Sequence, residues 1–201
     1  MNQLLSKFFC FFVLLLLAGC GEPNVPTADS YLGGRAGLDR GPAPEDGYDP
    51  DSYWDAAGVS GSPRIVINLR EQRAYYYRGG TLVGRARIST GREGQNTPAG
   101  SYKVIGKSKD HVSNLWGNFV DAQGNVVKSG VTIRNEQPPP GSRFVGSPMP
   151  YFLRLTNGGI GMHAGYLPGY PASAGCIRMP MFIAEKFFVN TELGTPVQIV
   201  N

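Results

Sequence analysis

The residues best suited to covalent chemistry in this sequence are His163 and Cys176, which lie within the stretch 160–180. A thiol can attack an acyl group when a nearby base takes its proton and backbone N–H groups stabilise the oxyanion that forms. Small residues and turn formers separate this histidine from this cysteine. The stretch therefore indicates a candidate acyl-transfer site, although an unpaired cysteine and a lone histidine are often ordinary buried residues.

The first 20 residues carry an export signal that ends in a cysteine. Lys7 precedes an unbroken apolar run of ten residues, 8–17, which is too short for a bilayer span of about 20 residues and fits a secretory signal. The residues Leu-Ala-Gly-Cys at 17–20 resemble the lipobox of bacterial lipoproteins. This resemblance implies that residues 1–19 are removed and that lipid chains on Cys20 anchor the protein.

The same resemblance predicts a location. Gly21, rather than Asp, follows the lipidated cysteine, and the Gram-negative sorting rule then implies the outer membrane, with the protein facing the periplasm. Export excludes nucleic acid as a partner. By this resemblance, Cys10 would leave with the signal and Cys20 would carry lipid, so Cys176 would have no disulfide partner within the chain. In an exported protein, such a cysteine indicates an intermolecular bridge or a free reactive thiol.

Composition divides the mature chain into a tether and a domain. Residues 20–58 are rich in Pro, Gly and Asp and have no sustained apolar period, which is typical of a flexible tether. Tyr48, Tyr53 and Trp54, near its end, are candidates to dock on the domain. Residues 59–201 hold 16 Lys and Arg against 7 Asp and Glu, and their length is normal for one domain. The scattered positive charge favours an anionic neighbour such as the cell wall or lipid headgroups.

The pattern of the domain is mostly strand. A Gly-Gly pair at 79–80 between apolar runs predicts a hairpin. Residues 180–192 predict one amphipathic helix, with Phe182, Ile183, Phe187 and Val189 on its apolar side. The expected fold is a mainly β domain, sandwich-like or barrel-like, with one or two short helices. The expected strands are 64–69, 73–78, 82–90, 101–106, 118–120, 126–127, 131–134, 151–155, 160–163 and 196–200.

Several motifs resemble those of the L,D-transpeptidase (YkuD-type) catalytic domain family. The segment Ser-Ala-Gly-Cys-Ile-Arg at 173–178 is similar to the family signature, in which a His-Gly pair precedes Ser/Thr-His-Gly-Cys, an apolar residue and Arg or Asn. The resemblance extends to S-T-G at 89–91, T-P-A-G-S-Y at 97–102 and the strand at 148–155. It covers about residues 62–200, and it implies the family's β fold.

The resemblance also implies a role for each residue of the motif. Cys176 would be the nucleophile and His163 the general base and acid, with a backbone carbonyl near Ala164 orienting the other imidazole nitrogen. The N–H groups of Cys176 and Gly175 would stabilise the oxyanion. Arg178 would hold a substrate carboxylate or brace the loop, and Ser173 would shape the turn.

Two positions depart from the family pattern: Ala174 stands where most members have His, and Ala164 where they have Gly. Because His163 fills the position of the base, we expect the chemistry to survive. His111 lies in a polar stretch and is interpreted as a solvated loop histidine. Tyr151, Tyr166 and Tyr170 are candidates to line the cleft. Two histidines and one free cysteine disfavour a zinc site, and no cofactor is expected.

The expected function is an L,D-transpeptidase that acts on peptidoglycan stem peptides through a cysteine thioester. The resemblance implies release of D-Ala, followed by a 3→3 cross-link or by attachment of a protein to the wall. Two alternatives stay open: an L,D-carboxypeptidase or cross-link hydrolase on the same scaffold, and a non-catalytic wall-binding lipoprotein. The sequence does not decide which amine accepts the acyl group.

Overall fold

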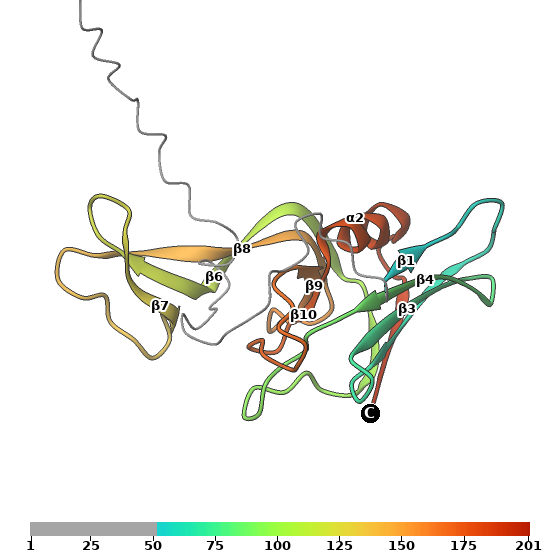
Figure 1. The fold of residues 1–201 in the computed structure, drawn as a ribbon, viewed down its shortest axis with the longest axis horizontal. Coiled ribbons are helices and arrows are strands. Elements are labelled where there is room, and N and C mark those ends of the chain that lie inside the picture. The colour runs from blue at the N-terminus through green and yellow to red at the C-terminus, as the bar shows by residue number, and fades with distance from the viewer. Residues whose placement is uncertain (1–51) are drawn as a thin grey trace, which may run out of the picture.

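The computed structural model describes residues 52–201, which form two β-sheets and one helix (Figure 1). The predicted mainly β fold is therefore confirmed. The six-stranded sheet has the order β1-β4-β3-β2-β11-β5, and the five-stranded sheet has the order β10-β9-β8-β6-β7. The strands of the first sheet are β1 (Tyr53–Trp54), β2 (Pro63–Asn68), β3 (Arg73–Arg78), β4 (Thr81–Arg87), β5 (Gly100–Lys103) and β11 (Pro196–Val200). Those of the second are β6 (Gly106–Val120), β7 (Val126–Thr132), β8 (Arg143–Arg154), β9 (Gly161–Ala164) and β10 (Ile177–Met179).

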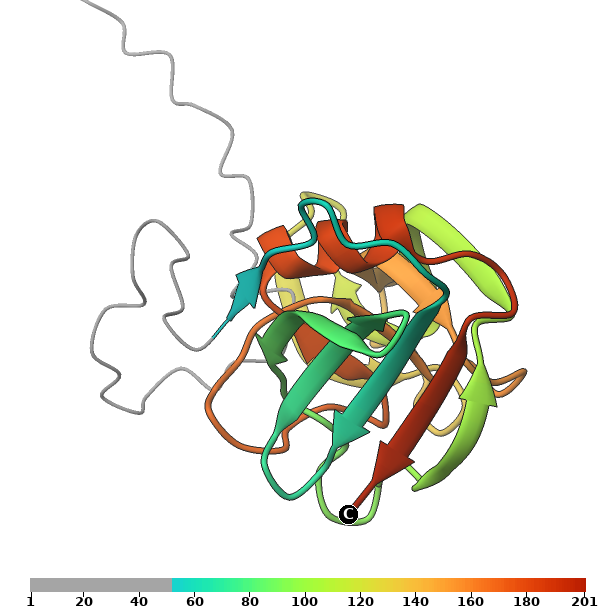
Figure 2. The same cartoon turned by 90° about the vertical axis from the view of Figure 1, so that its right-hand side faces the viewer.

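The first sheet is built on the hairpin that the Gly-Gly pair predicts. Gly79 and Gly80 have φ of +53° and +96°, conformations that residues with a Cβ rarely adopt, and they join β3 to β4. In β2, Ile65 and Ile67 are fully buried, whereas Arg64, Val66 and Asn68, which alternate with them, are not. This is the period-two pattern of a strand with one buried face. The C-terminal strand β11 pairs in parallel with β2 and antiparallel with β5 (Figure 2).

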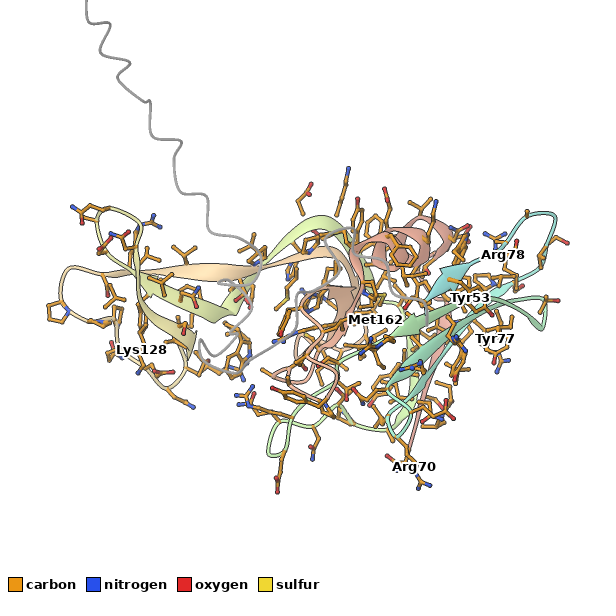
Figure 3. All side chains as sticks on the ribbon, viewed as in Figure 1. Tyr53, Arg70, Tyr77, Arg78, Lys128 and Met162 are labelled. Carbon is orange, nitrogen blue, oxygen red and sulfur yellow. The ribbon has the colours of Figure 1, made fainter. Side chains whose placement is uncertain are left out.

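The core lies where the first sheet, the short strands β9 and β10, and helix α2 (Met181–Asn190) meet. Met162 from β9 and Ile177 from β10 belong to one buried cluster with Ile65 of β2, and Figure 3 shows Met162 near the middle of the molecule. The predicted helix is confirmed with shorter bounds. It buries Ile183 and Phe187, whereas Val189 is 70% exposed, so the predicted apolar side was too wide.

The folded domain begins earlier than the sequence analysis placed it. Strand β1 pairs with β4, and the Trp54 ring packs on Tyr76 and Phe187 at centroid distances of 5.0 and 6.0 Å. Residues 52–58 therefore belong to the domain rather than to the tether, because an aromatic ring covers apolar surface that would otherwise meet water. The docking predicted for Tyr53 and Trp54 is confirmed.

A long three-stranded arm extends from one side of the domain (Figure 1). Strands β6, β7 and β8 form it, and Lys128 lies in its outer part (Figure 3). Strand β6 has 15 residues, of which the strands predicted from the sequence include only the first residue and the last three. Most of the residues in its first half are exposed or half-buried, so they show no alternating apolar pattern.

The predicted signal peptide, the lipidation site Cys20 and the tether up to residue 51 lie outside the described residues. Within residues 52–201, no helix is long and apolar enough to cross a membrane.

Candidate active site

The register of two short parallel strands brings the predicted catalytic residues onto one face of the second sheet. In β10 and β9, Ile177 pairs with Met162 and Arg178 pairs with His163. Continuing this register by one residue places Cys176 level with Gly161. Side chains alternate along a strand, so the side chains of Cys176, His163 and Arg178 share one face, while the opposite face carries the buried core residues.

Strand β8 adds another side chain to this face. Arg154 pairs with Gly161 on the other side of β9, so Cys176, Gly161 and Arg154 form a row across three strands. Neighbouring strands lie about 4.8 Å apart, so the Cα atoms of Cys176 and Arg154 are separated by about 10 Å. A Cβ at position 161 would lie 2.5 Å from a ring carbon of Phe152, so any residue larger than glycine would collide with this ring.

His163 is held in a single tautomer. Its Nδ1 lies 2.8 Å from the carbonyl oxygen of Ala164, and the side chain is 2% exposed. A carbonyl can only accept, so Nδ1 carries the proton and Nε2 remains a base. The pKa of His163 is lowered from 6.5 to about 4, chiefly by burial; the hydrogen bond to Ala164 opposes this shift, and the charges of Arg178 and His111 contribute to it. The imidazole is therefore neutral at pH 7.

The thiol of Cys176 is partly exposed and lies in a cavity. Its Sγ donates a long hydrogen bond, 3.6 Å, to the carbonyl oxygen of Gly159. Burial raises the pKa of the thiol, while a hydrogen bond from Gly161 and the charges of Arg178 and Arg154 oppose the rise. The resting site thus holds a neutral thiol and a neutral imidazole, rather than an ion pair.

The loop before Cys176 is fixed by a network of polar contacts. The hydroxyl of Ser173 accepts the N–H of Gly175 at 3.0 Å and donates to the carbonyl oxygen of Cys176 at 2.5 Å. The hydroxyl of Thr97 accepts the N–H of Gly91 and donates to the carbonyl oxygen of Gly175 at 2.8 Å. The bonds of Thr97 join the loop before Cys176 to the 89–91 and 97–102 motifs.

Gly175 differs from its predicted role in one respect. Its φ of +116° explains the glycine, and its N–H donates to the hydroxyl of Ser173 in this structure. The N–H of Cys176 takes no part in the loop network of Ser173 and Thr97. Cys176 therefore offers the better placed oxyanion donor of the two.

A cavity of about 770 Å³ surrounds the thiol. One wall comes from the loop that leads to Cys176, and the other comes from the arm, including Ser113 and Trp116. His111 also lines the cavity: it lies in β6, and its ring stacks on Phe152 at 4.3 Å. The interpretation of His111 as a solvated loop residue was therefore wrong, because the stretch that carries it is a strand. The contact between His111 and Phe152 joins two neighbouring strands, β6 and β8, and the sequence alone does not show which strands are neighbours.

The tyrosines predicted for the cleft divide into two groups. Tyr166 and Tyr170 line the cavity, as does Ala174. Tyr151 instead packs against the core and against the ring of Phe188. No cluster of three or more potential His, Cys, Asp or Glu metal ligands occurs in the part of the chain that the structure describes.

Comparison with known proteins agrees with this geometry. The model of the L,D-transpeptidase catalytic domain (YkuD) matches residues 62–199. The chain belongs to this family. A probable L,D-transpeptidase ErfK/SrfK of Salmonella typhimurium is 29% identical over 143 residues, which are 68% of this chain and 44% of that protein. This L,D-transpeptidase domain thus spans less than half the length of that curated relative.

Solved structures share the fold of this L,D-transpeptidase domain. An Enterococcus faecium L,D-transpeptidase with a cysteine-to-serine substitution is 25% identical, with a TM-score of 0.52 over 70% of this chain and 50% of that one. LD transpeptidase LdtMt1 in complex with imipenem is 19% identical, with a TM-score of 0.53 over 69% of this chain and 59% of that one. The family model and the shared fold identify an L,D-transpeptidase catalytic domain in this chain.

Proposed function

We propose that this protein transfers acyl groups of peptidoglycan stem peptides through a thioester on Cys176. The observation that carries the proposal is the β9–β10 register, which sets Cys176 and His163 on one face beside a cavity, with Nε2 of His163 left as a base. A nearby base is what a neutral thiol needs in order to attack.

The geometry supports a sequence of proton transfers. As Cys176 Sγ attacks the carbonyl carbon between the third residue and D-Ala, Nε2 of His163 takes the thiol proton. The Cys176 N–H stabilises the oxyanion, a contribution of roughly 3 kcal/mol for one such donor. The imidazolium then protonates the departing amine of D-Ala, and the thioester remains.

Resolution of the thioester decides the product. An amine of a second stem would give a 3→3 cross-link, and an amine of a protein would attach that protein to the wall. Water would give the carboxypeptidase or cross-link hydrolase reaction. The test is to incubate the full-length protein with purified disaccharide-tetrapeptide and to analyse the products by mass spectrometry.

Each outcome of this test is distinct. We expect D-Ala release and a dimer with a 3→3 link, both absent in Cys176→Ala. Tripeptide alone would indicate hydrolysis. A folded protein that releases no D-Ala, and that a carbapenem does not acylate, would favour the non-catalytic wall-binding lipoprotein.

We also propose that lipid on Cys20 anchors the enzyme to the outer membrane, facing the periplasm. The support is the lipobox-like sequence at 17–20 and the glycine after it. Metabolic labelling with a palmitate analogue should mark the wild type in the outer-membrane fraction. Loss of the label in Cys20→Ser is expected, and an equally labelled variant would refute the anchor.

A further inference from the structure

Two arginines lie close to the thiol, and only one of them belongs to the family signature. Arg178 is paired with His163, and Arg154 lies in the row of Cys176 across Gly161. Both line the cavity, and the charges of both act on the thiol. Arg92 also lines the cavity, but it is exposed and its guanidinium donates to the carbonyl oxygen of Ser173.

The guanidinium of Arg154 is held in place from two sides. It stacks on the ring of Phe152 at 5.2 Å from the centroid, and its aliphatic part lies over Gly106. Phe152 is itself buried, with His111 stacked at 4.3 Å. A guanidinium that stacks by its face still presents its N–H groups along its edge, in the fork that suits a carboxylate.

The charge of these two arginines is not compensated by the domain. No Asp or Glu lines the cavity. Within residues 52–201, neither Arg154 nor Arg178 forms an ion pair; the ion pair described there joins Lys128 to Glu136, far out on the arm. Half-buried positive charges without a partner are costly, and an anion that enters the cavity would offset that cost.

We propose that Arg154, together with Arg178, forms a carboxylate-binding subsite that selects acyl donors with a free carboxylate close to the scissile bond. The identity of the donor rests on the proposed function. A stem tetrapeptide offers two such groups: the side-chain carboxylate of the third residue and the terminal carboxylate of D-Ala. Both have the same chemistry, so the experiment distinguishes them.

The experiment measures binding without turnover. The full-length Cys176→Ala protein is titrated with three tetrapeptides: the free acid, the side-chain amide and the C-terminal amide. We expect one amide to bind about tenfold to a hundredfold more weakly than the free acid, since a hydrogen bond to a charged group is lost. The position of the amide in the weakly binding peptide identifies which of the two carboxylates the arginines bind.

Substitution of Arg154 then tests its part in this preference. Arg154→Gln in the same background should bind the free acid and that amide equally, and Arg154→Lys should keep part of the preference. The matched control is Arg64→Gln, which removes an arginine stacked on Tyr77 at 4.6 Å on the other sheet and should change nothing. Equal binding of all three peptides, or an unchanged preference in Arg154→Gln, would overturn the subsite.

The result also separates this inference from the proposed function. A wild-type protein that binds with the expected preference but releases no D-Ala would refute the function and leave the subsite standing. A wild-type protein that releases D-Ala while its Cys176→Ala variant shows no preference would refute the subsite alone.

Discussion

The protonation states of His163 and Cys176 determine how the site can begin its reaction. Burial lowers the pKa of the imidazole and raises that of the thiol, so the neutral pair is the resting form. In the proposed reaction, the proton then moves to Nε2 as the sulphur attacks, instead of being transferred beforehand. A neutral thiol also reacts slowly with oxidants, because the thiolate is the reactive form. In the periplasmic location proposed above, this arrangement would protect the free cysteine from oxidation.

The lowered pKa of His163 predicts a contribution to stability that depends on pH. The folded pKa is about 4 and the ordinary value is 6.5, so between these values the unfolded chain binds the proton that the folded chain excludes. The contribution is complete above pH 6.5 and is lost as the pH falls to about 4. A difference of this size corresponds to about 3 kcal/mol.

Urea unfolding of the wild type and of His163→Gln, at pH 7 and at pH 4, measures this contribution. We expect the wild type to lose about 3 kcal/mol more free energy of unfolding than the variant between these two pH values. Equal losses would mean that the imidazole is not excluded from water as the structure indicates.

Ser173 acts through the loop rather than on the substrate. Ser173→Ala would leave the buried N–H of Gly175 without a partner and would release the carbonyl of Cys176. Such an unsatisfied group costs about 1–3 kcal/mol, which would loosen the position of the thiol. We expect kcat to fall about tenfold or more while KM changes less than twofold.

The variant Ser173→Thr keeps the hydroxyl and serves as the control in the same steady-state assay. Its kcat should stay above that of Ser173→Ala. A Ser173→Ala variant that changed KM alone would instead place this hydroxyl in substrate binding.

At the scale of elements, the sequence predicted best where one side of a strand is buried. The alternation of Ile65 and Ile67 and the Gly79-Gly80 pair were sufficient to predict β2 and the β3–β4 hairpin, because burial and turn geometry leave a direct mark on the sequence. His163 and Cys176 were predicted as site residues from their types and from the resemblance to the family signature, and the structure places them on one face of the second sheet. Strand β6 left no such mark, since most of the first half of this strand lies outside the core, and His111 was therefore placed in a loop. Arg154 lies in the predicted strand 151–155, but its place beside Cys176 depends on the pairing of β8 with β9, which leaves no mark in the sequence.

The N-terminal strand β1 was also hidden, because it is two residues long and follows a polar segment. The contribution of β1 to stability comes mainly from the side chain of Trp54. The indole packs over Gly84, where a Cβ would lie 2.6 Å from it, and against the rings of Tyr76 and Phe187. Trp54→Ala should therefore lower the free energy of unfolding by about 2–3 kcal/mol, less than for a fully buried tryptophan.

Denaturant unfolding followed by circular dichroism measures this loss. Tyr53→Ala, in the same strand, is the matched control, since Tyr53 is 38% exposed, and a change below about 1 kcal/mol is expected. If both variants were as stable as the wild type, the folded domain would begin after β1.

At the scale of the whole molecule, the second sheet contributes to two separately packed parts, the main core and the arm. Strands β9 and β10 and the end of β8 take part in the main core, whereas the arm has buried residues of its own: Phe119, Val120 and Val131 are buried but lie outside the main cluster. Gly117 and Gly146 lie where the arm strands cross so closely that a Cβ would lie about 2 Å from a backbone oxygen. The cavity lies between these two bodies, so the shape of the cleft depends on how the arm packs.

The separate packing of the arm predicts that it can be loosened alone. Phe119 is fully buried, and its ring meets Phe144 at 6.3 Å. Phe119→Ala should remove the centre of this small core. Amide hydrogens of β7 and of the outer part of β8 should then exchange faster, while those of β2, β3 and β11 keep their protection. Because the arm forms one wall of the cavity, KM for the tetrapeptide should rise several-fold with kcat within about twofold.

Hydrogen exchange and steady-state kinetics on the same preparations test both parts. Val127→Ala removes apolar atoms from an arm residue that is 52% exposed, so it should leave exchange and KM unchanged. Faster exchange throughout the domain in Phe119→Ala would show that the arm and the core unfold as one cooperative unit. An unaltered KM despite a loosened arm would show that the catalytic loop alone holds the substrate.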